Sequence, residues 1–414
     1  MNSETQIPRP SWYGPDFPEY RVRRPWVMED MIAAQVDLPA VLAEQDGVVA
    51  RIANRVSAAV SSGAPVTVTG CGTAGHAARG FAAVVNAALA ELGVAGGPVQ
   101  WRQPFEAAGK PWPGLLIAVS HGARSTATLA ALEAARGRGA GTVLVTATAR
   151  AGVDELADLV LNLPMRDRSW CHTLAYLSPI VVAAAVADHL RAKPFQPAPL
   201  EQLIRQLLGP SAAYGAIASA ISRNERIATV GTGADLITAR ELALKISEAT
   251  WVPACAHELE DVLHGHLVPH DERSALIAVV TESGSTRSIK RTASLFRTAR
   301  RIGLATALVA TKNAGAEEID EELTSAGRSI APDSSELDQT VGSLVAGGVA
   351  LQRLTLELAH ELRRNPDLLR RDEAAYREAR NLAEAKLPDE HATDVTDENE
   401  RAAPGGRGPG TRTS

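Results

Sequence analysis

The sequence predicts an α/β protein made of two tandem, doubly wound parallel-sheet domains followed by a disordered tail. Short, continuous apolar runs alternate with Ala- and Leu-rich stretches of helical period. The same succession of runs and loops occurs twice along the 414 residues. The last residues of the chain lack large apolar side chains, as disordered segments do.

Four apolar runs in the first half are expected to be strands. They are VTVT (66–69), LLIAVS (115–120), TVLVT (142–146) and LVLNL (159–163). Strands that helices cover on both faces are apolar at successive positions, whereas strands with one wet face alternate. Because these runs are continuous, the sequence favours a parallel sheet with helices on each side.

The second half repeats both the strands and the loops. Its runs are RIATV (226–230), ALIAVVT (275–281) and ATALVAT (305–311). The turn at 70–72 matches the turn at 231–233, and the loop after Ser120 matches the loop after Thr281, both with an offset of 161 residues. One offset shared by two separate loops indicates duplication of a domain. We therefore expect domains at 28–195 and 196–362, joined by the Pro-containing stretch RAKPFQPAPL.

The two ends are expected to differ from these domains. Residues 1–27 are rich in Pro, Arg and aromatic side chains, which predicts an extended arm that packs on a partner domain or subunit. Residues 388–414 offer too little apolar surface to offset the entropy of ordering, so we expect a disordered tail. No run resembles a signal peptide or a membrane helix, which predicts a cytoplasmic protein without membrane contact.

Composition excludes several classes of function. The 42 basic and 48 acidic residues give a net charge of -6, with no basic excess that would favour nucleic acid. The three cysteines, Cys71, Cys171 and Cys255, lie far apart. This spacing fits a reducing compartment and argues against a disulfide framework or a Cys-ligated zinc site.

Ligands of parallel α/β sheets bind beyond the carboxyl ends of the strands, which directs attention to the loops there. Residues 70–75 formally match the dinucleotide pattern GxGxxG. No strand ending in Asp or Glu follows at the usual distance of about 20 residues, so nicotinamide or flavin binding is disfavoured. The alternatives are a phosphate cradle of backbone N–H groups, which would use Gly72 and Thr73, or a plain tight turn.

The next loop contains Ser120, His121, Arg124 and Ser125 just before a predicted helix. Hydroxyls and free N–H groups at a helix start suit a phosphate monoester. The alternative is an ordinary N-cap by Ser125 or Ser120. The second copy of this loop, 281–287, has more hydroxyls, but its Glu282 works against an anion.

Two polar patterns follow in the second half. Glu241, Lys245 and Glu248 are spaced i, i+4 and i+7, which places them on one helix face as either a surface ion-pair ladder or a catalytic set. The next segment is rich in acidic and histidine side chains: His257, Glu258, Asp261, His264, His266 and His270. It could supply a general acid or base near neutral pH. A metal site is disfavoured because no histidine pair at i, i+4 lies on one predicted helix.

Together these loops resemble the tandem sugar-isomerase (SIS) family, and most closely the isomerase half of glucosamine-6-phosphate synthase and its free-standing isomerase and deaminase relatives. The family carries a CGTS turn, an SQSGET loop, an EGALKxKE helix and an ELKHGP segment. Here the corresponding stretches are CGTA (71–74), SHGARS (120–125), ELALKISE (241–248) and DVLHGH (261–266). The resemblance spans about residues 28–362.

The resemblance implies a mechanism. Glu248 would move a proton between C1 and C2 of a sugar phosphate through an enediol(amine), Lys245 would assist, and His264 would help to open the sugar ring from the partner subunit of a homodimer. No cofactor or metal is implied. The implied substrate-binding residues are Gly72, Thr73, Ser120, His121, Arg124, Ser125, Glu241 and Arg364.

Departures from the family pattern are also informative. Ala74 replaces a serine, and His121 and Gly122 replace Gln and Ser of the phosphate loop. The segment 363–387 stands where the family has an active-site lysine, but Arg363 and Arg364 occupy that place, and arginine cannot form a Schiff base. Lys386 is a more distant candidate. No glutaminase domain is expected, so glutamine would not be the nitrogen source.

We therefore expect a phosphosugar aldose–ketose isomerase or an amino-sugar-phosphate deaminase/isomerase. The alternative is a sugar-phosphate-binding sensor without turnover. The substituted phosphate loop favours the sensor, whereas the set Glu241, Lys245, Glu248 and His264 favours the enzyme. A binding module has no need of a carboxylate that transfers protons.

Overall fold

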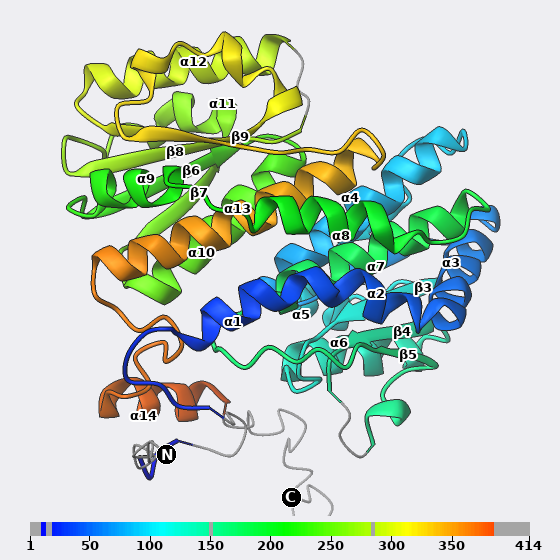
Figure 1. The fold of residues 1–414 in the computed structure, drawn as a ribbon. Helices are drawn as coiled ribbons and strands as arrows, with labels where there is room; N and C mark the ends of the chain where they lie inside the picture. The colour runs from blue at the N-terminus through cyan, green and yellow to red at the C-terminus, as the bar shows by residue number, and fades with distance from the viewer. Residues whose placement is uncertain (1–9, 14–18, 149–151, 283–285, 385–414) are drawn as a thin grey trace, which may run out of the picture. The chain divides into compact units, whose positions relative to one another are not determined.

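The computed structural model describes residues 10–13, 19–148, 152–282 and 286–384, and its framework is two five-stranded sheets (Figure 1). The first sheet contains β1 (Val66–Thr69), β2 (Val99–Trp101), β3 (Leu115–Val119), β4 (Gly141–Thr146) and β5 (Leu159–Asn162). The second contains β6 (Arg226–Gly231), β7 (Ala254–Glu258), β8 (Ser274–Val280), β9 (Ala305–Thr311) and β10 (Gly327–Ala331). Adjacent strands pair in parallel in both sheets.

The two sheets have the same topology. The first runs β2-β1-β3-β4-β5, and the second, read from its β7 edge, runs β7-β6-β8-β9-β10. This is the flavodoxin-like order 2-1-3-4-5 in each case. The predicted fold class, two doubly wound parallel-sheet domains in tandem, is confirmed.

Helices cover both faces of each sheet. In the first half they are α1 (Val27–Ala33), α2 (Leu38–Ala43), α3 (Asp46–Ser61), α4 (Thr73–Glu91), α5 (Pro104–Gly109), α6 (Thr126–Gly137) and α7 (Leu174–Leu190), with short turns η1 (Ala34–Asp37) and η2 (Val153–Glu155). In the second they are α8 (Pro197–Leu207), α9 (Ala213–Ile221), α10 (Ala234–Thr250), α11 (Leu259–Asp261), α12 (Thr286–Arg301) and α13 (Gln339–Glu361), with η3 (Val262–His266), η4 (Lys312–Ala314), η5 (Ala316–Glu318) and η6 (Glu321–Leu323).

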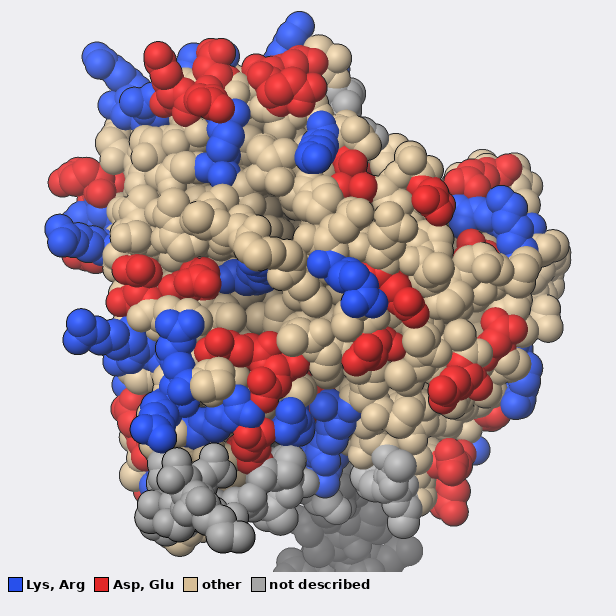
Figure 2. All heavy atoms as spheres, in the orientation of Figure 1, with Lys and Arg blue, Asp and Glu red and all other residues tan. Residues whose placement is uncertain are grey.

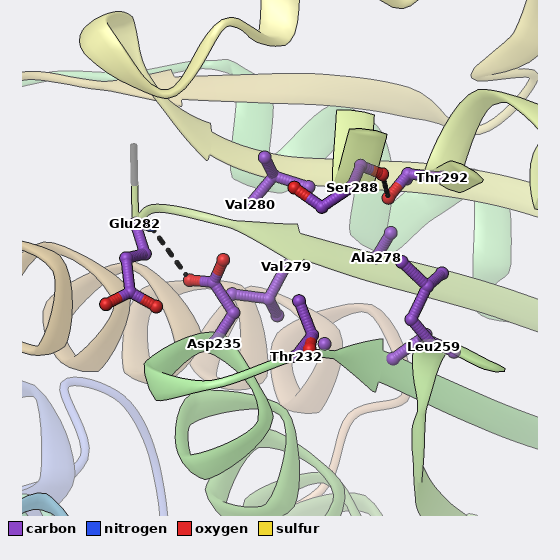
Figure 3. Close-up of a pocket in the computed structure, with 11 residues that line it drawn as sticks. Thr232, Asp235, Leu259, Ala278, Val279, Val280, Glu282, Ser288 and Thr292 are labelled. Carbon is purple, nitrogen blue, oxygen red and sulfur yellow. Dashed lines mark hydrogen bonds between the residues drawn. The ribbon is translucent and has the colours of Figure 1, made fainter. Parts of the chain in front are cut away.

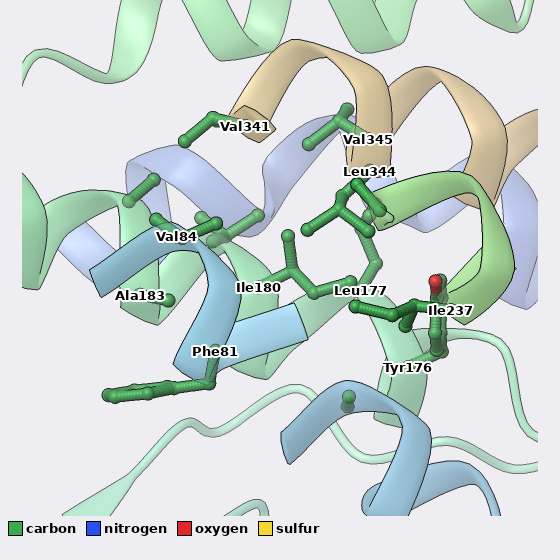
Figure 4. Close-up of a cluster of buried hydrophobic side chains, with 14 of the residues drawn as sticks. Phe81, Val84, Tyr176, Leu177, Ile180, Ala183, Ile237, Val341, Leu344 and Val345 are labelled. Atoms are coloured by element: carbon green, nitrogen blue, oxygen red, sulfur yellow. The ribbon is translucent and has the colours of Figure 1, made fainter. Parts of the chain in front are cut away.

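The inner helices join the two halves into one hydrophobic core. One face of each sheet packs against its own outer helix, α6 or α12, in a separate apolar cluster. The other faces share a single cluster that includes side chains of α4, α7, α10 and α13. Figure 4 shows Ile180 of α7 beside Leu344 of α13, with Val84 of α4 on the neighbouring helix. The loops at the ends of the two sheets are therefore held in a fixed relation to each other.

The internal repeat extends to backbone torsion angles. Gly72 precedes α4 with φ 55° and ψ -129°, and Gly233 precedes α10 with φ 57° and ψ -127°. This conformation mirrors the β region and is open to glycine but strained for residues with a Cβ. Equivalent turns in the two halves thus share a conformation as well as a sequence pattern.

The chain forms a compact unit through Leu369. The end of the predicted N-terminal arm packs on this same unit, because the backbone N–H groups of Val27 and Met28 donate to the Asp367 carboxylate at 2.8 and 2.9 Å. Residues 370–414 are a separate unit, in which α14 spans Ala374–Glu384. The predicted tail, 388–414, lies outside the described residues. Within the described part of the chain, none of the helices combines the length and hydrophobicity that crossing a bilayer requires.

Candidate active site

The first candidate loop, 70–74, turns the chain from β1 into α4. Gly72 is the N-cap of α4, and both Cys71 and Gly72 are exposed. A Cβ at Gly70 would lie 2.7 Å from the carbonyl oxygen of Ala74, so the turn excludes a side chain there. The turn therefore presents backbone at the start of a long helix, where N–H groups favour an anion.

The second candidate loop meets the first through a contact among Cys71, Ser125 and Thr128. Ser125 occupies the N-cap position of α6, but its hydroxyl makes no capping hydrogen bond. Instead it donates to Cys71 Sγ at 3.3 Å and accepts from Thr128 Oγ1 at 3.1 Å. The alternative of an ordinary side-chain cap therefore does not hold for Ser125, and two helix N-termini adjoin one another at this edge of the sheet.

The remaining predicted residues of this loop differ in their surroundings. Ser120 is buried, whereas Arg124 is exposed. His121 faces the segment between β5 and α7, where its Nε2 accepts the Asp167 backbone N–H at 2.8 Å. Burial lowers the pKa of His121 to about 4. Its imidazole is therefore neutral and bound within the chain, and the predicted substrate contact would need a different ring orientation.

The equivalent site in the second half is filled by the chain's own carboxylates (Figure 3). Asp235 Oδ1 accepts the N–H of Thr281 at 2.8 Å and the N–H of Glu282 at 3.1 Å. Glu282 Oε2 accepts the Ala234 N–H, at the start of α10, at 3.2 Å. Burial raises the pKa of Asp235 to about 7, despite these hydrogen bonds.

The repeat explains why the halves differ at this place. By the offset of 161 residues, Asp235 and Glu282 correspond to Ala74 and His121 of the first half. The first half therefore lacks the two carboxylates that occupy the donors of the second. The expectation that Glu282 opposes an external anion agrees with this geometry, although residues 283–285 of that loop lie outside the described residues.

The ladder predicted on α10 is buried and not a surface feature. Glu241 is fully buried and Lys245 keeps only 1% of its side chain exposed, whereas Glu248 keeps 24%. Lys245 Nζ lies 3.5 Å from Glu241 Oε1 and forms a close ion pair with Glu248. Burial opposes the ammonium form of Lys245, but Glu248 and Glu241 outweigh it and raise its pKa. Burial also raises the pKa of Glu248, and Lys245 opposes that rise.

Glu241, Lys245 and Glu248 form a row along α10, and Glu241 links this row to the first candidate loop. Its Oε1 accepts from Thr73 Oγ1 at 3.1 Å, and its Oε2 lies 2.7 Å from His76 Nδ1. Thr73 and His76 belong to α4, in the other half of the molecule. The structure thus brings together four predicted residues, Thr73, Glu241, Lys245 and Glu248.

A segment that the sequence analysis did not single out encloses this row. The β5–α7 segment, residues 163–173, places the buried thiol of Cys171 where the charges of Lys245 and Glu248 act on it. Asp167 of the same segment accepts the N–H groups of Thr173 and Ala175 at 2.5 and 3.3 Å, at the start of α7. Burial raises the pKa of Asp167 to about 6.

Arg364 lies at the far end of α10. Its guanidinium carbon is 4.0 Å from the ring centroid of Trp251, the residue that ends α10 in a left-handed conformation. Trp251 follows Glu248 by three residues, so Arg364 is near the outward end of the row. Lys386 lies outside the described residues.

His264 pairs with Glu260 of its own segment, and none of the hydrogen bonds or ion pairs among the described residues joins it to Glu241, Lys245 or Glu248. The His264 side chain is 72% exposed in η3, and Nε2 lies 3.5 Å from Glu260. The rings of His257 and His266 stack at 4.4 Å in the same loop. Among the described residues, no group of three or more His, Cys, Asp or Glu side chains is arranged to hold a metal ion.

Basic and acidic side chains are interspersed over the face shown in Figure 2. Arg79 and Arg102 are each stacked on a tryptophan, with distances of 3.4 and 4.0 Å from the guanidinium carbon to the ring centroid.

Three residues that touch the site were missed by sequence reasoning. Thr128 lies three residues after Ser125 on a helix, and this i, i+3 spacing could have indicated the contact. His76 follows Thr73 at the same spacing, on the face that meets Glu241. Cys171 stands in a segment with no periodic pattern, and no local signal places it beside Lys245.

Comparisons with known proteins bear on this site. No family model matches the chain. It is 28% identical over 238 residues to a glutamine–fructose-6-phosphate aminotransferase (isomerizing) of Symbiobacterium thermophilum, and 27% identical over 235 residues to that of Zymomonas mobilis. The matches cover 52% and 53% of this chain but only 37% and 38% of those enzymes.

Solved structures share the fold at low sequence identity. The C-terminal domain of glucosamine-fructose-6-phosphate aminotransferase from Francisella tularensis superposes with a TM-score of 0.68 at 15% identity, over 84% of this chain and 99% of that one. Tagatose-6-phosphate ketose/aldose isomerase from Escherichia coli gives 0.66 at 16% identity, over 85% and 97%. With these matches the resemblance drawn from the motifs is confirmed: the chain is similar in sequence, over about half of its length, to isomerizing aminotransferases, and shares the fold of the isomerase half of glucosamine-6-phosphate synthase.

Proposed function

We propose that this chain is a sugar-phosphate isomerase that shuttles a proton between C1 and C2 of an open-chain sugar, with Glu248 as the shuttle. One observation carries the proposal. The row on α10 ends in a carboxylate that remains 24% exposed, while the lysine that pairs with it is buried. A carboxylate with a raised pKa can take up a proton from one carbon and return it to the next.

The other residues have supporting roles in this proposal. The turn at Gly72 and Thr73 and the loop with Ser120, Arg124 and Ser125 hold the phosphate, using two helix N-termini. Lys245 stays protonated between its two carboxylates and stabilises negative charge that develops on the enediol oxygen.

The names of similar proteins support the isomerase class. The two curated relatives are isomerizing aminotransferases, and one fold neighbour is a ketose/aldose isomerase. Another fold neighbour, with a TM-score of 0.53, is a glucosamine-6-phosphate deaminase from Thermotoga maritima. We therefore include an amino-sugar-phosphate deaminase/isomerase in the proposal, and release of ammonia from an amino-sugar phosphate distinguishes it from a plain isomerase.

The proposal includes a homodimer in the cytoplasm. His264 is exposed and pairs with Glu260, with no hydrogen bond or ion pair to Glu248 among the described residues, so in this proposal a second copy brings it to the site. Such a shared site follows from a two-fold interface in which each chain contributes to its neighbour.

Exchange of the C2 hydrogen of sugar phosphates with deuterated solvent tests the proposal. A thermal-shift screen of hexose, pentose and amino-sugar phosphates, with the unphosphorylated sugars as controls, first selects the ligand. We expect exchange with the wild type, and loss of at least about 100-fold in Glu248→Gln with binding nearly unchanged. Glu318→Gln, on an exposed turn, is the matched control. Undiminished exchange in Glu248→Gln would remove Glu248 from the mechanism.

A non-catalytic sensor is the second candidate function. It is favoured by Ala74, which lacks a hydroxyl, and by His121, whose Nε2 is occupied by the Asp167 N–H. Both features reduce the number of side-chain donors to a phosphate. Tight binding of a sugar phosphate with no C2 exchange and no ammonia release in the wild type would support this candidate over the enzyme.

A further inference from the structure

His76 contacts the candidate site from the opposite half of the molecule. It lies one turn into α4, after Thr73, with 21% of its side chain exposed. Its Nδ1 is 2.7 Å from Glu241 Oε2, across the interface between α4 and α10. The motifs that indicated the site do not include this residue.

The chemistry of Glu241 fixes the direction of this hydrogen bond. An ionised carboxylate only accepts hydrogen bonds, so His76 Nδ1 is the donor. Glu241 is fully buried, and a buried carboxylate requires donors to replace water. Thr73 Oγ1 serves one oxygen at 3.1 Å, and His76 serves the other.

The two donors from α4, Thr73 and His76, affect how strongly the Lys245 ammonium is bound by Glu241 and how strongly by Glu248. The ammonium stands between Glu241, at 3.5 Å, and Glu248, with which it forms the closer ion pair. If Glu241 lost a donor, its oxygens would attract the ammonium more strongly, and Glu248 would lose part of its partner. We infer that His76 is a positioning residue for Glu248: by donating to Glu241, it leaves the Lys245 ammonium to the carboxylate that transfers the proton.

The charges that face Glu248 make the expected effect clear. They are Lys245 and Glu241 on its own helix, His76 on α4 and the thiol of Cys171 on the β5–α7 segment. Burial and the charge of Glu241 raise the pKa of Glu248, whereas Lys245 and, to a smaller extent, His76 lower it. Removing the His76 donor therefore leaves Glu248 protonated up to a higher pH, where it can no longer act as a base.

The inference rests on the proposed role of Glu248, so its test includes a readout that needs no turnover. Difference infrared spectroscopy follows protonation of the Glu248 carboxyl with pH, and the signal is assigned by its absence in Glu248→Gln. In His76→Phe, which keeps a ring but has no donor, we expect protonation at a pH about one unit above that of the wild type. In His76→Asn, whose amide can donate from nearly the same place, we expect a titration close to the wild type.

Activity gives the second readout. At a pH below the wild-type titration, C2 exchange in His76→Phe should fall about tenfold, recover as pH rises, and leave KM for the sugar phosphate within about threefold. His189→Phe is the matched control, since His189 pairs with Asp46 at 2.7 Å elsewhere on the molecule.

The outcomes separate the inference from the proposed function. An unchanged Glu248 titration in His76→Phe, or a His76→Asn that titrates like His76→Phe, would overturn the inference. Absence of exchange in the wild type with every sugar phosphate would instead overturn the isomerase proposal, and the infrared titration would still decide the role of His76. If His76→Phe does not fold, His76→Gln replaces it, because its longer side chain shifts the donor.

Discussion

Lys245 is the residue on which the electrostatics of the site depend. It is buried beside Glu241 and Glu248, so its charge replaces the water that the fully buried Glu241 lacks and part of the water around Glu248. Burying an ion pair is close to neutral for stability, but removing one member leaves the other charge uncompensated. The loss of stability on a substitution therefore depends on whether a charged group is left buried without its partner.

We predict that Lys245→Met lowers the free energy of unfolding by about 3–5 kcal/mol, because Glu241 is then buried without a cation. The double variant Glu241→Gln with Lys245→Met should recover a large part of this loss, since it removes both charges. Urea unfolding of the wild type, both single variants and the double variant measures the coupling. Additive losses would show that the pair has no energetic link.

In the loop that we propose holds the phosphate, Ser125 and Arg124 are expected to make different kinds of contribution. We predict that Ser125→Ala weakens sugar-phosphate binding by about 3- to 10-fold, the value of a neutral hydrogen bond. Arg124→Ala should also weaken binding, with an effect that shrinks at high salt. Calorimetry at two salt concentrations makes the measurement, and Arg51→Ala, exposed on α3, is the control. Unchanged affinity in both variants would place the anion elsewhere.

At the residue scale, the sequence predicted types and spacing better than environment. The i, i+4, i+7 pattern on α10 was recognised, but its burial was not, because α4 and the β5–α7 segment cover it from distant parts of the chain. His121 was predicted from its loop position alone. The backbone of Asp167, which binds it, lies 46 residues further along the chain.

Helix starts are the elements that distinguish the two halves. Gly72 and Gly233 have the same backbone conformation, yet a Cβ at Gly72 would meet nothing within 4 Å, whereas one at Gly233 would lie 2.8 Å from Glu282 Oε2. The first helix start is therefore open, and the second is closed by Glu282.

We predict that Gly72→Ala and Gly233→Ala each destabilise the fold by about 1–3 kcal/mol through backbone strain. Only Gly72→Ala should weaken sugar-phosphate binding, because only that turn adjoins Ser125. Thermal unfolding measures the first effect, and calorimetry with a sugar phosphate measures the second. Weaker binding in Gly233→Ala alone would indicate that the second half holds the anion.

Strand prediction succeeded for buried elements and was less complete at the sheet edges, where β5 was predicted but β7 and β10 were not. All seven predicted apolar runs are strands. The edge strands β7 and β10 were missed, because each is partly exposed and mixes polar with apolar residues. The sequence of β7, ACAHE, contains no apolar run, so the sequence does not distinguish this strand from the histidine-rich segment that follows it.

At the scale of the whole molecule, buried carboxyl groups couple stability to pH. Burial raises the pKa of Asp235 to about 7, above its unfolded value near 3.9. The folded protein thus binds the proton more tightly, and this contribution is complete below pH 3.9 and is lost as pH rises through 7.

We predict that the stability of Asp235→Asn relative to the wild type increases between pH 5 and 7, by up to about 1.4 kcal/mol per pH unit. The relative measure is needed because His121, whose pKa is lowered to about 4, changes stability in the opposite direction over part of this range. Urea unfolding at several pH values tests this, with Asp154→Asn, at an exposed position, as the control. A constant difference would mean that Asp235 is ionised in the fold throughout.

The proposed dimer predicts complementation between inactive chains. Glu248→Gln and His264→Ala homodimers should both be inactive, whereas co-expressed chains should recover about a quarter of wild-type activity, because half of the dimers are hybrids with one intact site. Sedimentation checks that the chains associate. A monomer with full activity at nanomolar concentration would contradict the shared site.

The bonds from Glu241 to Thr73 and His76 also govern how this protein can diverge. The partners are 168 and 165 residues apart in sequence and belong to different copies of the duplicated domain. A substitution on one side of the contact leaves the partner residue on the other side unchanged. Substitutions in the two copies should therefore be correlated at this contact, whereas elsewhere the two copies can diverge in sequence independently. A chimera that joins one copy of this chain to the other half of a distant homologue should therefore be active only if both sides of the contact come from the same protein, even where each half folds well.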